Sequence, residues 1–139
     1  MIINNYLVRS EDHYHIVFRE LNFKFNKRMI ILMCGELGSG KTTFIKQLLA
    51  HEYDFHNTSS PTFGLINTYN IQNKLIFHYD LYRIDKESEL NEIGIYDNLE
   101  IEATHFIEWP EVIPSNLIKP DMKISFETMD EYRLISIKR

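Results

Sequence analysis

The sequence predicts an α/β fold, a sheet with parallel core strands, antiparallel additions and flanking helices. A continuous apolar run over residues 29–34 is typical of a strand buried on both faces of a sheet. A glycine-rich loop follows this run, and an apolar stripe at helical spacing follows the loop. Most later segments have strand patterns, and short turns separate two pairs of them. This order of elements is typical of an α/β sheet with antiparallel additions.

The length and composition suit one domain, which we expect over residues 1–139. A content of 44% apolar and 25% charged residues is ordinary for a globular protein and too apolar for a disordered one. Twenty acidic and fifteen basic residues leave a net charge of −5. This charge has the wrong sign for a protein that binds nucleic acid or anionic lipid with its whole surface, although it is compatible with a small basic patch.

The first helix is expected after Ser10, whose hydroxyl is placed to cap it. Acidic residues stand in its first turn, and apolar residues then recur at helical spacing: Tyr14, Val17, Phe18 and Leu21. The central strand is expected over Met29–Cys34. A second helix is expected from about Lys41 to His51, because apolar residues again mark one face of it.

Two segments after this helix have the pattern of a hairpin. Phe63–Ile71 and Lys74–Asp80 are extended in character and are separated only by Gln72-Asn73. Asp85 is placed to cap a short acidic helix, which Gly94 is placed to end.

The last third of the chain is expected to add strands. Thr104–Trp109 predicts a strand that stops at Pro110, because proline lacks the amide that a sheet ladder needs. Alternating apolar residues on both sides of a polar turn at 129–131 predict a closing hairpin between Met122 and Ile137.

Acidic residues are concentrated between Asp85 and Glu102. This segment holds seven acids and one lysine, so the rest of the chain is close to neutral. Such a segment is a solvated helix and loop or, alternatively, a surface that faces a partner.

Cysteine content and hydropathy indicate the cytoplasm and no membrane contact. Cys34 is the only cysteine, so an intrachain disulfide and a multi-cysteine metal site are excluded, which fits a reducing compartment. The N-terminus has no basic region leading into an apolar run, and the chain has no stretch of eighteen apolar residues.

The most informative segment, Gly35–Thr42, matches G-x-x-x-x-G-K-[ST] at every fixed position. In such a loop the backbone amides of Gly38, Ser39 and Gly40 point at phosphate oxygens, and the following helix presents its positive end. Lys41 is expected to bridge the β- and γ-phosphates, and the Thr42 hydroxyl to bind Mg²⁺. Thr43 is placed to reach the α-phosphate. The loop therefore predicts a P-loop NTPase-like sheet that binds a nucleotide.

Missing motifs narrow the choice of nucleotide and reaction. A GTPase needs an N-K-x-D segment to read guanine, and both Asn-Lys pairs, at 26–27 and 73–74, lack the aspartate. Arg83 stands three residues after Asp80, at the position where a D-x-x-G segment has glycine, so GTP specificity is not expected. Small-molecule kinases usually close an arginine-bearing lid, whereas the arginines of this chain are scattered, so a kinase is the weaker interpretation.

Two carboxylates stand at the ends of apolar strands. Asp80 ends one strand and Glu108 ends the other, where a P-loop protein keeps the acid that holds Mg²⁺ directly or through water. One of them is expected to bind Mg²⁺ while the other orients or deprotonates the attacking water, and the residues leave open which does which. The alternative is that both are exposed acids at strand ends.

Four ordered motifs resemble those of the TsaE (YjeE) family, the bacterial P-loop ATPases required for threonylcarbamoyladenosine modification of tRNA. They are the P-loop with Thr43 and Phe44, then Ser60-Pro61-Thr62-Phe63, His78-Tyr79-Asp80-Leu81-Tyr82-Arg83, and Ile107-Glu108-Trp109-Pro110-Glu111. In that family, ATP binding and slow hydrolysis support a complex of two related proteins that transfers a threonylcarbamoyl group to tRNA adenosine. The resemblance implies ATP and Mg²⁺ as cofactors, that two-protein complex as the partner, and tRNA as an indirect or accessory contact.

The resemblance also implies roles for individual residues. Lys41 and Thr43 would hold phosphates, Thr42 and Glu108 would bind Mg²⁺, and Asp80 would be the second acidic group and metal candidate. We count Lys41, Asp80 and Glu108 as the catalytic candidates. Thr62, in a loop expected to respond to the γ-phosphate, and Ser10 complete the expected nucleotide contacts. Two alternatives remain, a nucleotide-sensing module that does not need hydrolysis and a small-molecule kinase.

Overall fold

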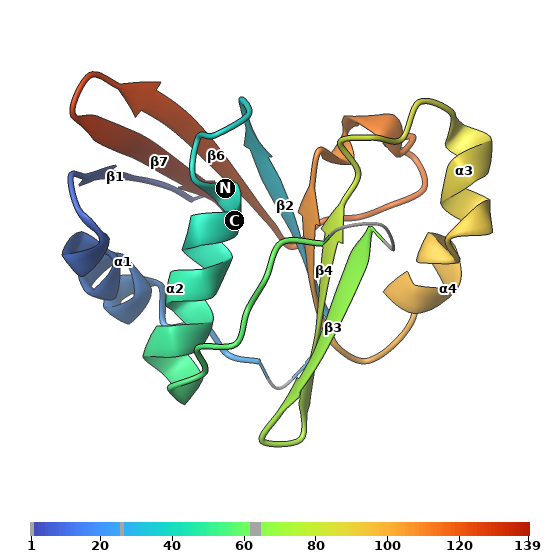
Figure 1. The fold of residues 1–139 in the computed structure, drawn as a ribbon, viewed down its shortest axis with the longest axis horizontal. Helices are drawn as coiled ribbons and strands as arrows, with labels where there is room; N and C mark the ends of the chain where they lie inside the picture. Colours follow the sequence, from blue (N-terminus) through green and yellow to red (C-terminus); the bar gives the residue numbers. More distant parts are fainter. Residues whose placement is uncertain (1, 26, 62–64) are drawn as a thin grey trace.

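Seven strands form one mixed sheet within residues 2–25, 27–61 and 65–139, the part of the chain that the computed structural model describes. Their order is β1-β7-β6-β2-β5-β4-β3, and helices lie on both faces of the sheet (Figure 1). The predicted combination of parallel core strands, antiparallel additions and flanking helices is confirmed.

The centre of the sheet is parallel. β2 (Met29–Gly35) lies between β5 (Thr104–Glu108) and β6 (Met122–Met129) and is parallel to both, and β4 (Lys74–Asp80) is parallel to β5. Alternate side chains of β2 enter the two cores on opposite faces, which is why its sequence is apolar without interruption. The carboxyl ends of β2, β4 and β5 therefore meet at one edge of the sheet, where the P-loop begins.

Antiparallel strands complete both sides. β3 (Ile66–Ile71) pairs with β4 in the predicted hairpin, whose turn residues Gln72 and Asn73 have φ of 51° and 65°. β7 (Tyr132–Lys138) pairs with β6 in the predicted closing hairpin, and β1 (Ile3–Val8) pairs with the outer side of β7. The expected start of β3 at Phe63 lies outside the described residues.

Two helices cover one face of the sheet. α1 (Tyr14–Leu21) follows a 3₁₀ turn, Glu11–His13, and α2 (Lys41–Tyr53) follows the glycine loop (Figure 1). Their predicted apolar stripes are confirmed as the packing surface, since Phe18 and Phe44 make an edge contact with ring centroids 5.2 Å apart. This core fixes the direction of α2, whose N-terminus carries Lys41 and Thr42.

The opposite face is covered by short elements. α3 (Glu87–Glu92), α4 (Ile95–Leu99) and a 3₁₀ turn at Pro110–Val112 surround a second core built on β4 and β5. Leu90, Ile95 and Leu99 are buried there, while most of the acidic residues of the 85–102 segment are exposed.

Several predicted boundaries are wrong. Ser10 precedes the first helical turn but its side chain makes no capping hydrogen bond. Lys86 rather than Asp85 precedes α3. Gly94, with φ of 73°, follows the end of α3 as predicted, but it also precedes helix α4, which was not expected. β5 ends at Glu108, because Trp109 takes φ of 58° and cannot continue a strand.

None of the helices in the described ranges has the length and hydropathy needed to cross a membrane.

Candidate functional site

The glycine loop turns tightly between β2 and α2. A Cβ on Gly35 would lie 2.8 Å from the Phe126 carbonyl oxygen, so close approach to β6 requires glycine at this position. Gly40, the residue before α2, has φ of 106°. Ser39 is buried, and its hydroxyl has no hydrogen-bond partner among the described residues. The loop therefore presents a buried hydroxyl without a hydrogen-bond partner at the N-terminus of α2. An anion bound there would be favoured by both features.

Lys41 is buried in this cradle. Its Nζ donates to the carbonyl oxygens of Gly35 and Glu36, at 2.6 and 2.9 Å, and lies 4.3 Å from the centre of the Trp109 ring. Burial lowers the pKa of Lys41, while the nearby carboxylates of Glu108 and Asp80 act in the opposite direction. The ammonium is thus held inside the loop where a phosphate would be received.

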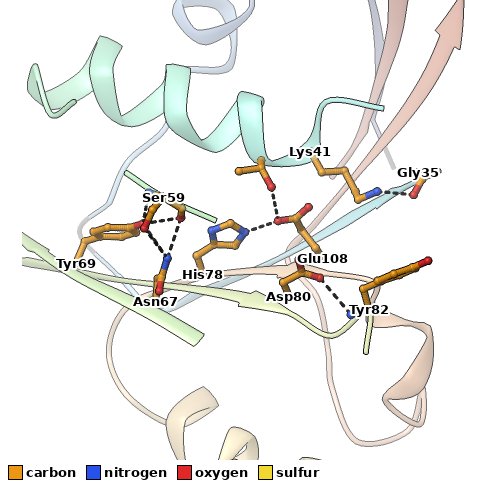
Figure 2. Close-up of polar contacts among 10 residues, drawn as sticks. Gly35, Lys41, Ser59, Asn67, Tyr69, His78, Asp80, Tyr82 and Glu108 are labelled. Carbon is orange, nitrogen blue, oxygen red and sulfur yellow. Dashed lines mark hydrogen bonds and ion pairs between the residues drawn. The ribbon is translucent and has the colours of Figure 1, made fainter. Parts of the chain in front are cut away.

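Glu108 lies at the centre of the site. Its Oε2 accepts a hydrogen bond of 2.9 Å from the Thr42 hydroxyl and a second one from Nε2 of His78 (Figure 2). All but 4% of the Glu108 side chain is buried. A carboxylate held by two donors has a fixed orientation, and its other oxygen is left to bind a cation or water.

Asp80 is brought beside Glu108 by the sheet. The two residues are register partners at the ends of the parallel strands β4 and β5. Burial raises the pKa of Asp80 and the neighbouring Glu108 adds to this, whereas the Tyr82 amide, which donates to Oδ1 at 3.1 Å, has the opposite effect. A carboxyl group with a raised pKa beside a second acid fits a proton-transfer role.

These groups share one cavity of about 270 Å³. Its lining includes most of the predicted site residues and four that we did not assign to the nucleotide: Leu37, Ser60, Trp109 and Arg133. Trp109 forms part of the wall, with its ring 4.9 Å from that of Tyr82. The cavity thus assembles Lys41, Thr42, Thr43, Asp80 and Glu108, as the sequence predicted, around the P-loop.

A second cavity, of about 340 Å³, adjoins the first at Arg133. Ser10 lies in this second cavity and not in the P-loop cavity. Arg133 comes from β7, and a Cβ on Gly40 would lie only 2.7 Å from its Nη1. The guanidinium therefore stands directly against the P-loop. The predicted contact Thr62 lies outside the described residues.

The donor set suits Mg²⁺ that arrives with a nucleotide. Thr42 and Glu108 offer two hard oxygen ligands side by side. Among the residues that the structure describes, no three His, Cys, Asp or Glu side chains gather as a metal site. The remaining ligands would have to be phosphate oxygens and water, as is usual for Mg²⁺ with nucleotides.

Two features of the site were not predicted from the sequence: the position of Arg133 and the contact between His78 and Glu108. Arg133 is in a strand far along the chain with no local motif, so nothing short of the pairing of β6 with β7 shows that it meets the P-loop. His78 stands two residues before Asp80, so its side chain projects from the same face of β4 as that of Asp80. That spacing is the signal that could have linked it to the site.

The family model of "Threonylcarbamoyl adenosine biosynthesis protein TsaE" matches residues 8–135. Proteins named "tRNA threonylcarbamoyladenosine biosynthesis protein TsaE" are similar over much of the chain. The one from Rickettsia felis is 40% identical over 111 residues, which cover 78% of this chain and 64% of that protein. The one from Haemophilus influenzae is 34% identical over 122 residues, or 86% of this chain and 77% of that protein. This chain thus spans less than two thirds of the Rickettsia felis protein.

A solved structure has the same fold. The crystal structure of Bacillus subtilis YdiB superposes with a TM-score of 0.70 at 21% identity, over 98% of this chain and 84% of that one. The P-loop NTPase-like α/β fold is thereby confirmed.

Proposed function

The chain belongs to the TsaE family, and from this premise we propose that it is a Mg²⁺-dependent, ATP-binding and ATP-hydrolysing subunit of the system that makes threonylcarbamoyladenosine in tRNA. The observation that carries the proposal is the Thr42–Glu108 hydrogen bond at the mouth of a P-loop, with Lys41 and Asp80 in the same cavity. We further propose that residues 1–139 form a single P-loop ATPase domain and that it works in the cytoplasm.

The phosphates would lie in the P-loop cavity. The amides around Gly38, Ser39 and Gly40 would bind their oxygens, and the buried Ser39 hydroxyl would gain a partner. Lys41 now donates to two backbone carbonyls, and it would exchange these for the terminal phosphates. Thr43 lines the same cavity and would contact the α-phosphate.

Thr42 and Glu108 would hold Mg²⁺, which neutralises charge on the phosphate oxygens when bound. His78 keeps Glu108 oriented for this task, because a ligating carboxylate is positioned by its own hydrogen bonds. Asp80 would orient the attacking water and take its proton, because burial raises its pKa and because the Glu108 carboxylate is already held by Thr42 and His78.

The nucleoside would extend toward the second cavity. Arg133 lies between the two cavities, and its guanidinium would contact the phosphates or ribose that pass it. Ser10 lines the far cavity, which supports its place among the nucleotide contacts at the nucleoside end rather than at the phosphates.

The decisive experiment is ATP hydrolysis by this protein with and without the two proteins of the threonylcarbamoyl transferase complex. We expect slow release of ADP and phosphate that depends on Mg²⁺ and rises in the presence of both partners. Absence of Mg·ATP binding under all these conditions would rule the proposal out.

A second candidate is a nucleotide-sensing module in which hydrolysis is not needed. The exposed acids of the 85–102 segment favour it, because they form a charged surface on the α3–α4 side of the sheet. Reconstituted tRNA modification separates the two functions. Repeated turnover with a non-hydrolysable ATP analogue would favour the module, and a single round would favour the ATPase.

Charge reversal at Glu87, Glu89 and Glu92 tests whether this acidic surface binds a partner. Loss of complex formation with nucleotide binding intact would assign it to an interface. Unchanged complex formation would show that these acids are ordinary solvated surface residues.

A further inference from the structure

Ser59 is held by more hydrogen bonds than its exposed position explains. Asn67 Nδ2 donates to the Ser59 carbonyl at 2.8 Å and lies 3.2 Å from the Ser59 hydroxyl. The Tyr69 hydroxyl donates to the same carbonyl at 3.1 Å, and it accepts from the Ser59 amide, also at 3.1 Å. We call these three residues the Ser59 anchor. Every backbone polar group of Ser59 is thus bound to a side chain of β3 (Figure 2).

The β3 side of the anchor is rigid. Asn67 and Tyr69 are two residues apart in β3, so their side chains project from the same face of the strand. Asn67 Nδ2 also lies 3.3 Å from the Tyr69 hydroxyl. The Tyr69 ring packs against Phe55, with ring centroids 5.6 Å apart. Because this packing holds the Tyr69 ring, it also fixes the direction in which the Tyr69 hydroxyl points, independently of the contact with Ser59.

The anchor is connected to the proposed nucleotide site from two directions. Ser60, the next residue, lines the P-loop cavity together with Asp80 and Glu108. Asn67 is also the register partner of His78, whose imidazole contacts Glu108. Figure 2 accordingly shows Ser59, Asn67, His78 and Glu108 in a row that leads to the N-terminus of α2.

We propose that Asn67 and Tyr69 are positioning residues, which hold Ser60 in the wall of the nucleotide cavity by fixing the backbone of Ser59. The proposal rests on the proposed function. Without the anchor, the segment 57–61 would depend on solvent for its hydrogen bonds, and Ser60 would lose its fixed place beside the carboxylates. No hydrogen bond joins Asn67 or Tyr69 to Lys41 or Glu108, so the hydrogen bonds of these two residues reach the site through Ser59 and Ser60.

The test uses Asn67→Ala, Tyr69→Phe and the double variant of the full chain. Tyr69→Phe keeps the ring against Phe55 and removes only the hydroxyl. Asn70→Ala is the matched control, since Asn70 is an exposed asparagine of the same strand on the opposite face. We expect each single variant to lower kcat for ATP about five-fold, the effect of one lost hydrogen bond. The double variant should lose less than the product of the two, because both residues act through Ser59.

Affinity for ADP distinguishes positioning from general damage. Ser60 shares the cavity with the two carboxylates, so the variants should change ATP turnover while ADP affinity and Tm stay near those of Asn70→Ala. Unchanged kcat in both single variants would overturn the proposal. A parallel loss of ADP affinity and Tm would also overturn it, because the residues would then only stabilise the fold.

Hydrogen exchange tests the anchor without any nucleotide. The amides of residues 57–60 should exchange faster in Asn67→Ala and Tyr69→Phe than in the parent and in Asn70→Ala. Equal exchange in all four proteins would overturn the proposal even if the parent hydrolysed ATP. A parent that binds no nucleotide, with the expected exchange difference present, would instead refute the proposed function and leave the anchor as a purely structural contact.

Discussion

His78 donates a hydrogen bond through Nε2 to the Glu108 carboxylate, and both side chains are almost completely buried. The two residues lie on neighbouring parallel strands, and Glu108 also accepts a hydrogen bond from the Thr42 hydroxyl. The contact therefore joins β4, β5 and the first turn of α2 at one carboxylate. It explains how an acid that the proposed mechanism needs in a single orientation is held in that orientation.

Removal of the His78 side chain should weaken the binding of Mg²⁺ that supports ATP hydrolysis. His78→Ala leaves Glu108 with one donor fewer, and we expect about a ten-fold rise in the Mg²⁺ concentration needed for half-maximal ATP hydrolysis. His78→Gln, which keeps an N–H donor, should recover part of this loss. A Mg²⁺ titration of steady-state ATPase activity measures both variants, and equal curves for parent and His78→Ala would contradict the role.

Lys41→Ala should abolish Mg·ATP binding. The variant removes the buried cation that the P-loop presents to the phosphates. Lys46→Ala is the matched control, because Lys46 is an exposed lysine of the same helix. Isothermal titration calorimetry with Mg·ATP should show heat for the parent and Lys46→Ala alone. Binding by Lys41→Ala would show that the phosphates lie elsewhere.

Substitutions of Asp80 and Glu108 should have different effects on nucleotide binding and turnover. Glu108→Ala is expected to remove turnover and to leave some nucleotide affinity that no longer depends on Mg²⁺. Asp80→Asn should keep Mg²⁺-dependent binding and lose about a hundred-fold in kcat, the usual contribution of a general base. Nucleotide titrations with and without Mg²⁺, together with single-turnover rates, separate the two. The reverse pattern would exchange the roles of the two acids.

Gly40→Ala should impair nucleotide binding, whereas Gly94→Ala should only destabilise the fold. Both glycines have positive φ, so alanine at either one is expected to cost about 1–2 kcal/mol of unfolding free energy. A Cβ at Gly40 would also displace Arg133, while a Cβ at Gly94 meets no atom of the described residues within 4 Å. Urea denaturation measures the shared effect, and ATP affinity measures the difference. Equal affinities in the two variants would mean that the place of Arg133 is unimportant.

His105 should make the fold less stable in mild acid. Burial lowers its pKa from an ordinary 6.5, and its ring is neutral, with Nδ1 accepting from the Tyr79 hydroxyl at 2.9 Å and Nε2 donating to the Ile101 carbonyl at 3.0 Å. The unfolded chain binds this proton more readily, so the stabilisation is complete above about pH 6.5 and is lost as the pH falls below it.

Urea denaturation between pH 8 and pH 5 checks this expectation. The contribution of His105 can reach about 1.4 kcal/mol per pH unit. His105→Gln cannot titrate in this range, so it should show a flatter dependence of unfolding free energy on pH than the parent does. If the unfolding free energies of the two proteins changed with pH in parallel, His105 would not be the cause of the acid destabilisation.

Much of the fold follows from short-range patterns. The apolar run of β2, the glycine loop and the stripe of α2 occupy consecutive residues, and each pattern reflects the local environment of its own backbone. The placement of Asp80 and Glu108 at one edge was also predictable, since both end parallel strands. The short helices α3 and α4 were less so, because a single glycine between them was compatible with an end as well as with a beginning.

The sequence by itself determined the P-loop, the order of most of the elements and the acids at the strand ends, because neighbouring residues encode turn geometry and periodicity. Only the tertiary structure decided that His78 meets Glu108, that Arg133 stands against Gly40, that Ser10 lies in an adjoining cavity, and that β3 holds Ser59. These contacts join residues far apart in the chain. They depend on strand order and register, which arise from the packing of the two cores as a whole and leave no local pattern in the sequence.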